Sequence, residues 1–269
     1  MRIAFKLAYF GTNYYGFQIQ PDVPTIESEL FGSLKKMGII DDPKSANYSG
    51  SGRTDRGVHS IGQVIAFDSD RPGLAIPRII NSELPGGIWV WARAEVPEDF
   101  DARRDAISRE YRYFFYGKSL NLPKIRSASR LLIGTHDFAN FSVNEGKSTV
   151  RTIKSVEVRV DGDFLFLDVV ADSFARYMVR KIVTALTMIG SGVRNAGWLT
   201  EMLDPEEHIE GIESAPAYGL VLKDVCFGNK VAFIEDDYAK KKAIQSLHKE
   251  FLWHGTMHEI LKEMEYELG

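Results

Sequence analysis

A glycine-rich segment in the first quarter of the chain carries the residues whose types and spacing are best suited to chemistry. From Gly50 to His59 the sequence reads GSGRTDRGVH, so Asp55 stands two residues after Arg53 in a loop bracketed by glycines. Glycine lets the backbone of such a loop lie close against a ligand. A carboxylate beside a guanidinium is expected to stay ionised at neutral pH, because the opposite charge favours the anion. An ionised carboxylate can act as a nucleophile or a base.

The residue types alone leave a structural interpretation of this loop open. Its aspartate could also cap a helix or pair with an arginine inside a turn. A second pattern, His254 and His258, has the four-residue spacing of metal ligands on a helix. No third ligand stands near them in the sequence, so structural or surface histidines are favoured and no metal is expected.

Apolar periodicity and turn signals divide the chain into two similar halves. The first half predicts, in order, a strand over 3–10, a helix over 25–37, strands near 46–49 and over 63–68, a helix over 76–82 and a strand over 88–96. The second predicts a strand over 107–116, a helix over 128–133, a hairpin of 153–160 with 164–170, a helix over 174–189 and a strand over 220–227. Both halves therefore follow the ferredoxin-like order.

This order predicts an α+β fold in which two ferredoxin-like halves, each with an antiparallel sheet and helices on one face, are joined across a central cleft. We expect an N-terminal half over 1–105 that carries the Asp55 loop, and a C-terminal half over 106–227. The remaining residues, 228–269, predict a helical C-terminal extension, which Gly255 is expected to interrupt.

Composition favours an ordinary folded protein of a reducing compartment. The 269 residues are 44% hydrophobic and 26% charged, which is typical of globular chains. The single cysteine, Cys226, excludes an internal disulfide, and its strand-like surroundings predict a small buried core residue. No run of about 18 apolar residues and no apolar leader is present, so we expect a cytoplasmic protein without a membrane segment.

The distribution of charge is compatible with a nucleic-acid partner, although the formal net charge is −4. Residues 201–213 hold six acidic residues and no Lys or Arg, whereas 103–130 hold eight basic residues against two acidic ones. Residues 176–194 add four more basic residues and no acid. A basic face on an acidic protein is therefore a reasonable expectation.

Six motifs in order resemble the tRNA pseudouridine synthase I family, TruA type, over most of residues 1–227. They are Tyr9–Gln20, Gly52–His59, Phe100–Arg103, Arg109–Tyr113, Phe174–Val183 and Ala215–Leu222. The chain departs from the family pattern at a few positions. Arg56 replaces a frequent Ala, Arg176 and Tyr177 replace residues that are often His or Asn, and Phe10 replaces a frequent Asp. These departures lie outside the presumed chemistry but bear on RNA contacts.

The resemblance implies an isomerase that converts uridine to pseudouridine at positions 38–40 in the anticodon arm of tRNA, as a homodimer and without a cofactor. Asp55 would be the catalytic carboxylate, engaging the ribose C1′ region or the uracil C6, or removing a sugar proton to give a glycal. Arg180 would pair with Asp55, and Tyr111 would stack on the extruded uracil. Arg53 would bind a phosphate of the flipped nucleotide or hold the RNA open.

Two other functions fit part of the pattern. A non-catalytic RNA-binding protein could share the ferredoxin-like halves with RNA-recognition motifs, but it would not need a carboxylate within Gly52–Gly57. An aspartate-dependent glycoside hydrolase would typically use two carboxylates. No second acid stands in a comparable loop, and Asp68 and Asp70 read as strand-end residues.

Overall fold

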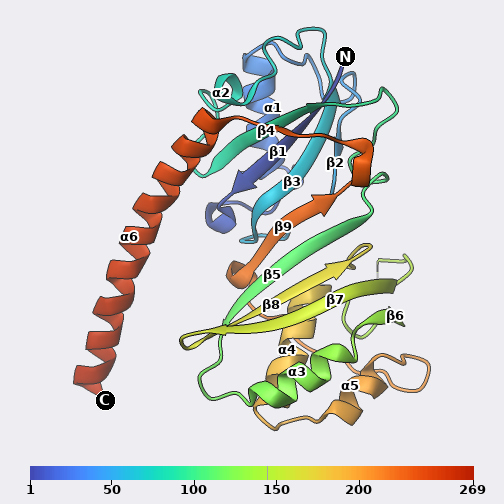
Figure 1. The fold of residues 1–269 in the computed structure, drawn as a ribbon, viewed down its shortest axis with the longest axis vertical. Helices are drawn as coiled ribbons and strands as arrows, with labels where there is room; N and C mark the ends of the chain where they lie inside the picture. Colours follow the sequence, from blue (N-terminus) through green and yellow to red (C-terminus); the bar gives the residue numbers. More distant parts are fainter. Residues whose placement is uncertain (144) are drawn as a thin grey trace.

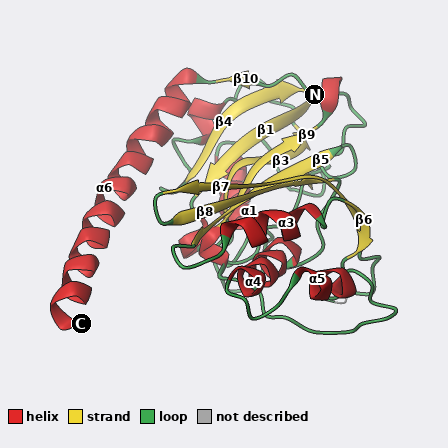
Figure 2. Cartoon of the chain, turned by 60° about the horizontal axis from the view of Figure 1, so that its bottom comes forward, coloured by secondary structure: helices red, strands yellow, loops and turns green. Residues whose placement is uncertain are grey.

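One large mixed sheet, with helices packed against it, organises the chain (Figure 1). The structure is a computed structural model that describes residues 1–143 and 145–269. The strand order across the sheet is β10-β4-β1-β3-β9-β5-β8-β7-β6, and β2 pairs with β3 beside this path. Figure 2 shows α3, α4 and α5 together on one side of the sheet.

In the N-terminal part of the sheet, apolar side chains of the strands pack against helix α1. Its strands are β1 (Arg2–Tyr9), β2 (Ser49–Gly50), β3 (His59–Asp68) and β4 (Ile88–Glu95), and its helices are α1 (Ile26–Lys36) and α2 (Pro77–Ile80). A capping box of Thr25 and Ser28 starts α1. Phe5, Phe67 and Leu30 are fully buried between the sheet and this helix, so β1, β3 and α1 share one apolar core.

The C-terminal part repeats the arrangement around a second core. Its strands are β5 (Ser108–Tyr116), β6 (Gly134–Asp137), β7 (Val150–Asp161), β8 (Phe164–Ala171) and β9 (Leu220–Cys226), and its helices are α3 (Leu122–Arg130), α4 (Met178–Gly190) and α5 (Ala196–Met202). The predicted hairpin of β7 and β8 is confirmed, with Gly162 at a φ of 57° in its turn. Strand β6 and helix α5 were not predicted.

The two parts share one continuous sheet, which corrects the prediction of two separate antiparallel sheets. Strand β9 lies between β3 and β5 and pairs with β3 in parallel, through His59 with Val221 and Ser60 with Leu222. The Ser60 hydroxyl also donates to the Leu222 carbonyl at 3.2 Å. The sequence pattern shows which runs form strands, but it does not show which strand edges meet.

Two helices begin at residues other than the predicted ones, for local backbone reasons. Helix α3 begins at Leu122 and not at residue 128, because the Asn121 side chain caps it by accepting from the Lys124 amide at 3.0 Å. Helix α4 begins at Met178 and not at residue 174, because Tyr177 adopts a left-handed conformation with a φ of 66°.

Two further predictions are wrong. Cys226 is exposed, because one extra residue in β9 opposite the Glu110–Tyr111 step reverses which side chains face the core, so Val225 is buried in its place. Gly255 does not interrupt the tail, since α6 runs unbroken from Asp237 to Leu268 after the short strand β10 (Ile234–Glu235). Within the described residues, none of the helices is both long enough and apolar enough to span a membrane.

The joint between β3 and β9 provides a stability prediction. A Cβ on Gly62 would lie 2.2 Å from the Lys223 carbonyl oxygen, so Gly62→Ala is expected to destabilise the fold by about 1–3 kcal/mol. Gly32 lies on the exposed side of α1, where an added Cβ would have no atom within 4 Å, so Gly32→Ala should stabilise by roughly 0.5–1 kcal/mol. Urea denaturation of both variants measures the difference. Equal stabilities would contradict the close approach at the joint.

Candidate active site

A cavity of about 1030 Å³ contains all four residues predicted for the site, Asp55, Tyr111, Arg53 and Arg180. Its walls come from both parts of the chain, since the lining includes the 48–56 segment of the first part and the 173–180 segment of the second. Residues far apart in the sequence are therefore brought together over the centre of the sheet, where β3, β9 and β5 are neighbours.

Strand β1 holds the Asp55 loop in place through its last residue, Tyr9. The hydroxyls of Tyr9 and Thr54 lie 2.9 Å apart and are both buried, and burial raises the pKa of Tyr9, which keeps its phenol neutral. The Phe17 amide donates to the Thr54 carbonyl at 3.0 Å. The close approach of these two segments requires glycine at position 16. Its φ is 100°, and a Cβ there would lie 2.9 Å from the Thr54 carbonyl oxygen.

A second support is Arg109, whose guanidinium donates to four backbone carbonyls in three separate segments. The acceptors are Ala106 at 3.1 Å, Asp172 at 2.8 Å, Ser51 at 3.0 Å and Arg103 at 2.8 Å. Burial lowers the pKa of Arg109, but the planar fork of an arginine suits such multiple acceptors. The sequence analysis placed Arg109 in a motif and gave it no role. The available signal was its charge in a strand where charged residues are interleaved with aromatic ones.

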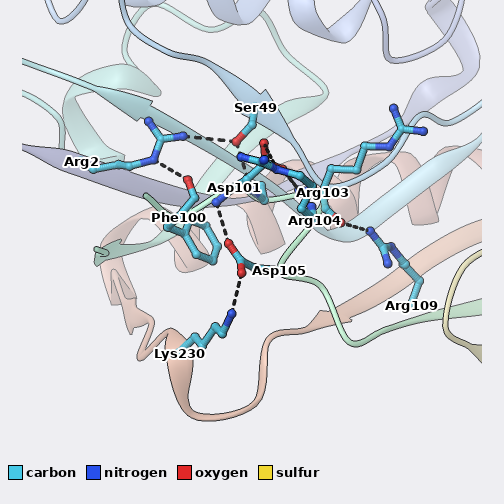
Figure 3. A network of polar contacts seen from close by, with 10 residues as sticks. Arg2, Ser49, Phe100, Asp101, Arg103, Arg104, Asp105, Arg109 and Lys230 are labelled. Atoms are coloured by element: carbon cyan, nitrogen blue, oxygen red, sulfur yellow. Dashed lines mark hydrogen bonds and ion pairs between the residues drawn. The ribbon is translucent and has the colours of Figure 1, made fainter. Parts of the chain in front are cut away.

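The 100–105 segment, which contributes two arginines to the cavity wall, is held by a polar network (Figure 3). Arg2 Nε donates to the Phe100 carbonyl at 2.5 Å. Asp105 accepts from the Asp101 amide at 2.7 Å and from Lys230 Nζ at 2.5 Å. Strand β1, the segment itself and the approach to the C-terminal tail are thus tied together, which fixes the backbone carrying Arg103 and Arg104.

Asp55 faces Arg180 across the two parts of the chain. Arg180 Nη1 lies 3.1 Å from Asp55 Oδ2, and Arg180 Nε donates to the Ala215 carbonyl at 2.6 Å, which fixes the guanidinium. Burial raises the pKa of Asp55, and the charge and hydrogen bond of Arg180 oppose this effect. The predicted pairing of Arg180 with Asp55 is present, and burial outweighs it in its effect on the pKa of the carboxyl, because the aspartate side chain is only 27% exposed.

Tyr111 forms an aromatic wall of the cavity. Its ring meets the Phe174 ring edge-on, with centroids 5.1 Å apart and an angle of 85° between planes. Burial, together with the nearby charge of Asp55, raises the pKa of Tyr111, so the phenol keeps its proton. A neutral hydroxyl on an apolar ring offers a stacking or packing surface and a single hydrogen-bond donor close to the carboxylate.

The cavity wall is basic. Among the described residues that line it, eight are basic and four acidic, the basic ones being Arg53, Arg56, Arg103, Arg104, Arg109, Lys147, Arg176 and Arg180. Arg53 is exposed, and the Arg56 guanidinium lies 4.0 Å from the centre of the Tyr15 ring. The predicted basic run 103–130 contributes only in part, since Arg112 is turned to an ion pair with Asp168. An anionic substrate is the chemistry this wall suits.

His59 is a structural residue of the site that the sequence analysis quoted only within a motif. Its Nδ1 accepts from the Gly11 amide at 3.1 Å, so the proton resides on Nε2, which lies 3.1 Å from the Tyr218 carbonyl oxygen. Burial lowers the pKa of His59, which favours this neutral form. The imidazole thereby links the loop after β1 to the segment before β9.

The other acids of the cavity wall are engaged in local contacts. Glu27 accepts from the Tyr48 hydroxyl at 3.0 Å, Asp101 accepts from the Arg103 and Arg104 amides at 2.8 Å, and Glu145 pairs with Arg176 at 3.3 Å. Across the described part of the chain, no group of three or more His, Cys, Asp or Glu side chains is placed to hold a metal ion. Of the four acids of the wall, Asp55 is the one that pairs with Arg180.

The electrostatics of the site can be tested by titration. The Asp55 carboxyl should keep its proton to a higher pH than an ordinary aspartate, whose pKa is about 3.9. Arg180→Gln removes the largest effect that lowers this pKa and should raise it further, whereas Arg180→Lys keeps a positive charge and should shift it less. NMR titration of ¹³C-labelled aspartate, assigned with Asp55→Asn, measures the shift. A pKa below the ordinary value would contradict the dominance of burial.

Comparison with known proteins agrees with the geometry. The sequence profile of the family described as tRNA pseudouridine synthase matches residues 6–103 and 128–228. Proteins named tRNA pseudouridine synthase A are 58% identical in Methanosarcina barkeri, over 98% of each chain, and 58% identical in Methanosarcina mazei, over 99% of each chain. These alignments include the C-terminal tail. The crystal structure of a Cbf5-Nop10-Gar1 complex matches 69% of this chain and 54% of that chain at 12% identity, with a TM-score of 0.34, too low to support an argument.

The family profile matches both parts of the sheet, and the named relatives are 58% identical over nearly their full length. Together these matches establish the family. The chain belongs to the tRNA pseudouridine synthase family, a family of isomerases that act on tRNA.

Proposed function

We propose that this chain converts uridine to pseudouridine at positions 38–40 of the tRNA anticodon arm, with Asp55 as the catalytic carboxylate. The observation that carries the proposal is the position of Asp55, which meets Arg180 at 3.1 Å in a basic cavity that Tyr111 also lines. Membership of an enzyme family leaves the non-catalytic RNA-binding alternative without support. The hydrolase alternative needs a second reactive carboxylate beside Asp55, whereas the other acids of the described wall accept from Tyr48, from the Arg103 and Arg104 amides, or pair with Arg176.

The reaction makes a specific demand on the carboxylate. The N1–C1′ bond breaks, the uracil turns, C5 joins C1′ and the proton leaving C5 balances the one gained at N1, so atoms and charge are conserved without a redox partner. Asp55 in its ionised form attacks C1′ or C6, or removes a sugar proton. Arg180 holds the carboxylate in place and favours its anionic form against burial. Burial limits the access of water, which would otherwise compete for a cleaved intermediate.

The target uridine must leave its stem before Asp55 can reach the sugar, at a cost of a few kcal/mol. We propose that the extruded base stacks beside Tyr111, since the aromatic ring and the acid lie in the same cavity. Arg53 is exposed at the wall and is proposed to bind a phosphate of the flipped nucleotide. The other arginines of the wall would supply further phosphate contacts that offset the cost of extrusion.

The proposal also covers the domains of the chain, its oligomeric state and its location. Residues 1–105 and 106–227 would act as two ferredoxin-like halves whose strands merge into the common sheet, and 228–269 as an added extension. We propose that the enzyme works as a homodimer on one tRNA. A tRNA substrate is consistent with a cytoplasmic enzyme.

Asp55→Asn tests the catalytic assignment. The amide keeps the size of the side chain but cannot act as a nucleophile or base, so pseudouridine formation should fall by roughly 10³-fold or more. Affinity for tRNA should change little, because the phosphate contacts remain. Chemical mapping of pseudouridine in the anticodon arm and filter binding measure the two effects. Asp70→Asn, an exposed acid outside the cavity, is the matched control and should retain activity.

Two results would contradict this assignment. Asp55→Asn with wild-type turnover would remove the aspartate from the chemistry, and wild-type enzyme that leaves positions 38–40 unmodified would refute the proposed target. Modification at other tRNA positions, lost in Asp55→Asn, would keep the catalytic role and change only the substrate site.

Arg53→Ala tests the phosphate role separately. Loss of one phosphate contact should weaken tRNA binding for all tRNA sequences alike and reduce the slope of log affinity against log salt by about 1. Lys44→Ala removes an exposed charge outside the cavity and should leave the slope nearly unchanged. Binding titrations at several salt concentrations measure both. An unchanged slope in Arg53→Ala would exclude a direct phosphate contact.

A further inference from the structure

Tyr177, in the wall of the cavity, has a backbone conformation that its side chain disfavours. Its φ is 66°, in the left-handed region, and the other non-glycine residues with a positive φ in the described part of the chain are Asp22 and Asn47. Asp and Asn adopt this conformation comparatively easily, whereas a bulky residue rarely does. Such strain is kept at functional sites, where the surrounding contacts hold the residue in place. The contacts of its side chain should therefore explain why a tyrosine stands there.

Helix capping does not explain this tyrosine. Tyr177 is the N-cap residue of α4, but its side chain makes no capping hydrogen bond, and Ser, Thr, Asp or Asn is preferred at such a position. The Lys181 amide donates to the Tyr177 carbonyl at 3.0 Å, so the helix starts directly after the left-handed residue. Arg180 follows three residues later, in the first turn of the helix. Residues at this spacing are neighbours on a helix surface, which is consistent with a contact between the Tyr177 ring and Arg180.

The Tyr177 ring contacts two guanidinium groups. The Cζ atom of Arg180 lies 5.1 Å from the centroid of the ring, and that of Arg176 lies 4.9 Å from it. Both distances are within the roughly 6 Å over which a cation is attracted to the face of an aromatic ring. The Tyr177 hydroxyl accepts from Arg176 Nη2 at 3.1 Å, and Arg176 Nη1 pairs with Glu145 at 3.3 Å. The ring is thereby held through its hydroxyl while it contacts Arg180.

For Arg180, the ring is a third contact of a different kind from the other two. Arg180 Nε donates to the Ala215 carbonyl at 2.6 Å, and Nη1 donates to Asp55 Oδ2 at 3.1 Å. Two hydrogen bonds along the edge of a planar group still allow it to tilt about the line that joins them. An aromatic ring packed against the guanidinium limits this tilt. The orientation that Arg180 needs in order to meet Asp55 therefore depends on the ring as well as on the two hydrogen bonds.

A small set of charged and titratable groups surrounds Asp55. From other segments these are Arg180, Arg176, Glu145 and Tyr111, and from its own loop Arg53 and Arg56. Burial raises the pKa of Asp55, and the hydrogen bond and charge of Arg180 oppose this effect most strongly. Arg176 lowers the same pKa and Glu145 raises it, and these two residues pair with each other. A loss of order at Arg180 should therefore raise the pKa of Asp55.

We propose that Tyr177 is a positioning residue of the active site, whose ring, set by the left-handed turn before α4, holds the Arg180 guanidinium against Asp55. The proposal rests on the proposed function, in which Asp55 acts as an anion. The effect on Asp55 is a property of the folded enzyme without RNA. It can therefore fail while Asp55→Asn still abolishes turnover, and it can hold even if Asp55 is not catalytic.

Titration of Asp55 in the enzyme without RNA tests the proposal. Tyr177→Asn removes the ring but accepts the left-handed turn, so the fold should persist while the pKa of Asp55 rises, by less than in Arg180→Gln. Tyr177→Phe keeps the ring and loses only the hydroxyl contact to Arg176, so the pKa should stay near that of the wild type. In an Arg180→Gln background, Tyr177→Asn should cause no further shift, because the ring acts through Arg180. NMR of ¹³C-labelled aspartate measures each pKa, and circular dichroism checks the fold.

Turnover gives a second readout. Tyr177→Asn should lower kcat about 10-fold and move the acidic limb of the pH profile to higher pH, since a carboxyl of raised pKa is ionised only at higher pH. The KM for tRNA should change by less than about threefold, and Tyr177→Phe should recover most of the loss in kcat. Tyr238→Asn is the matched control, because its ring lies 5.7 Å from Lys242 Nζ and outside the cavity, so both readouts should match the wild type.

Three titration results would overturn the proposal. They are an unchanged pKa of Asp55 in Tyr177→Asn, an equal rise in Tyr177→Phe, and a further rise when Tyr177→Asn is added to Arg180→Gln. Each would show that the ring does not act on Asp55 through Arg180. A loss of kcat with an unchanged pKa would make the ring a contact for RNA and would equally exclude the positioning role. If Tyr177→Asn does not fold, Tyr177→Gly, which also accepts a positive φ, takes its place in both measurements.

Discussion

The ion pair between Asp55 and Arg180 is the interaction on which the rest of the structure depends, because its partners are 125 residues apart in the chain. Asp55 belongs to a loop between β2 and β3, and Arg180 to the first turns of α4. The pair forms only when both parts of the sheet are assembled, so the cavity and the fold are completed together. Burial works against the charge of Asp55, and Arg180 is what makes a buried carboxylate tolerable there.

Several contacts hold the two parts of the chain in the geometry that this pair requires. Arg109 donates to four carbonyls in three segments, and His59 links the loop after β1 to the segment before β9. Most of these contacts end on backbone atoms, which a change of side chain at the acceptor does not remove. A reactive group is therefore supported by neighbours that have little conformational freedom of their own, as accurate positioning requires.

The sequence predicted most strands and the site residues, but not the joints between them. Period-two runs and the Asp-Gly turn located β7 and β8, because both signals are local. The motif resemblance selected Asp55, Tyr111, Arg53 and Arg180, which do line one cavity. The parallel pairing of β3 with β9 and the burial of Asp55 depend on distant segments, so no local pattern reveals them. The bulge that exposes Cys226 was missed for the same reason, since one extra residue changes the face of those that follow.

The unbroken sheet beneath the cavity has a consequence for how a substrate enters. Two halves linked only by a flexible segment could rotate toward each other around RNA. In this fold, the pairing of β3 with β9 would have to break for the floor of the cavity to bend. The strand pairing therefore resists bending of the floor of the cavity. Under the proposed function, the deformation needed for recognition would fall on the nucleic acid, and stems that open easily at the target nucleotide would gain an advantage over stiffer ones.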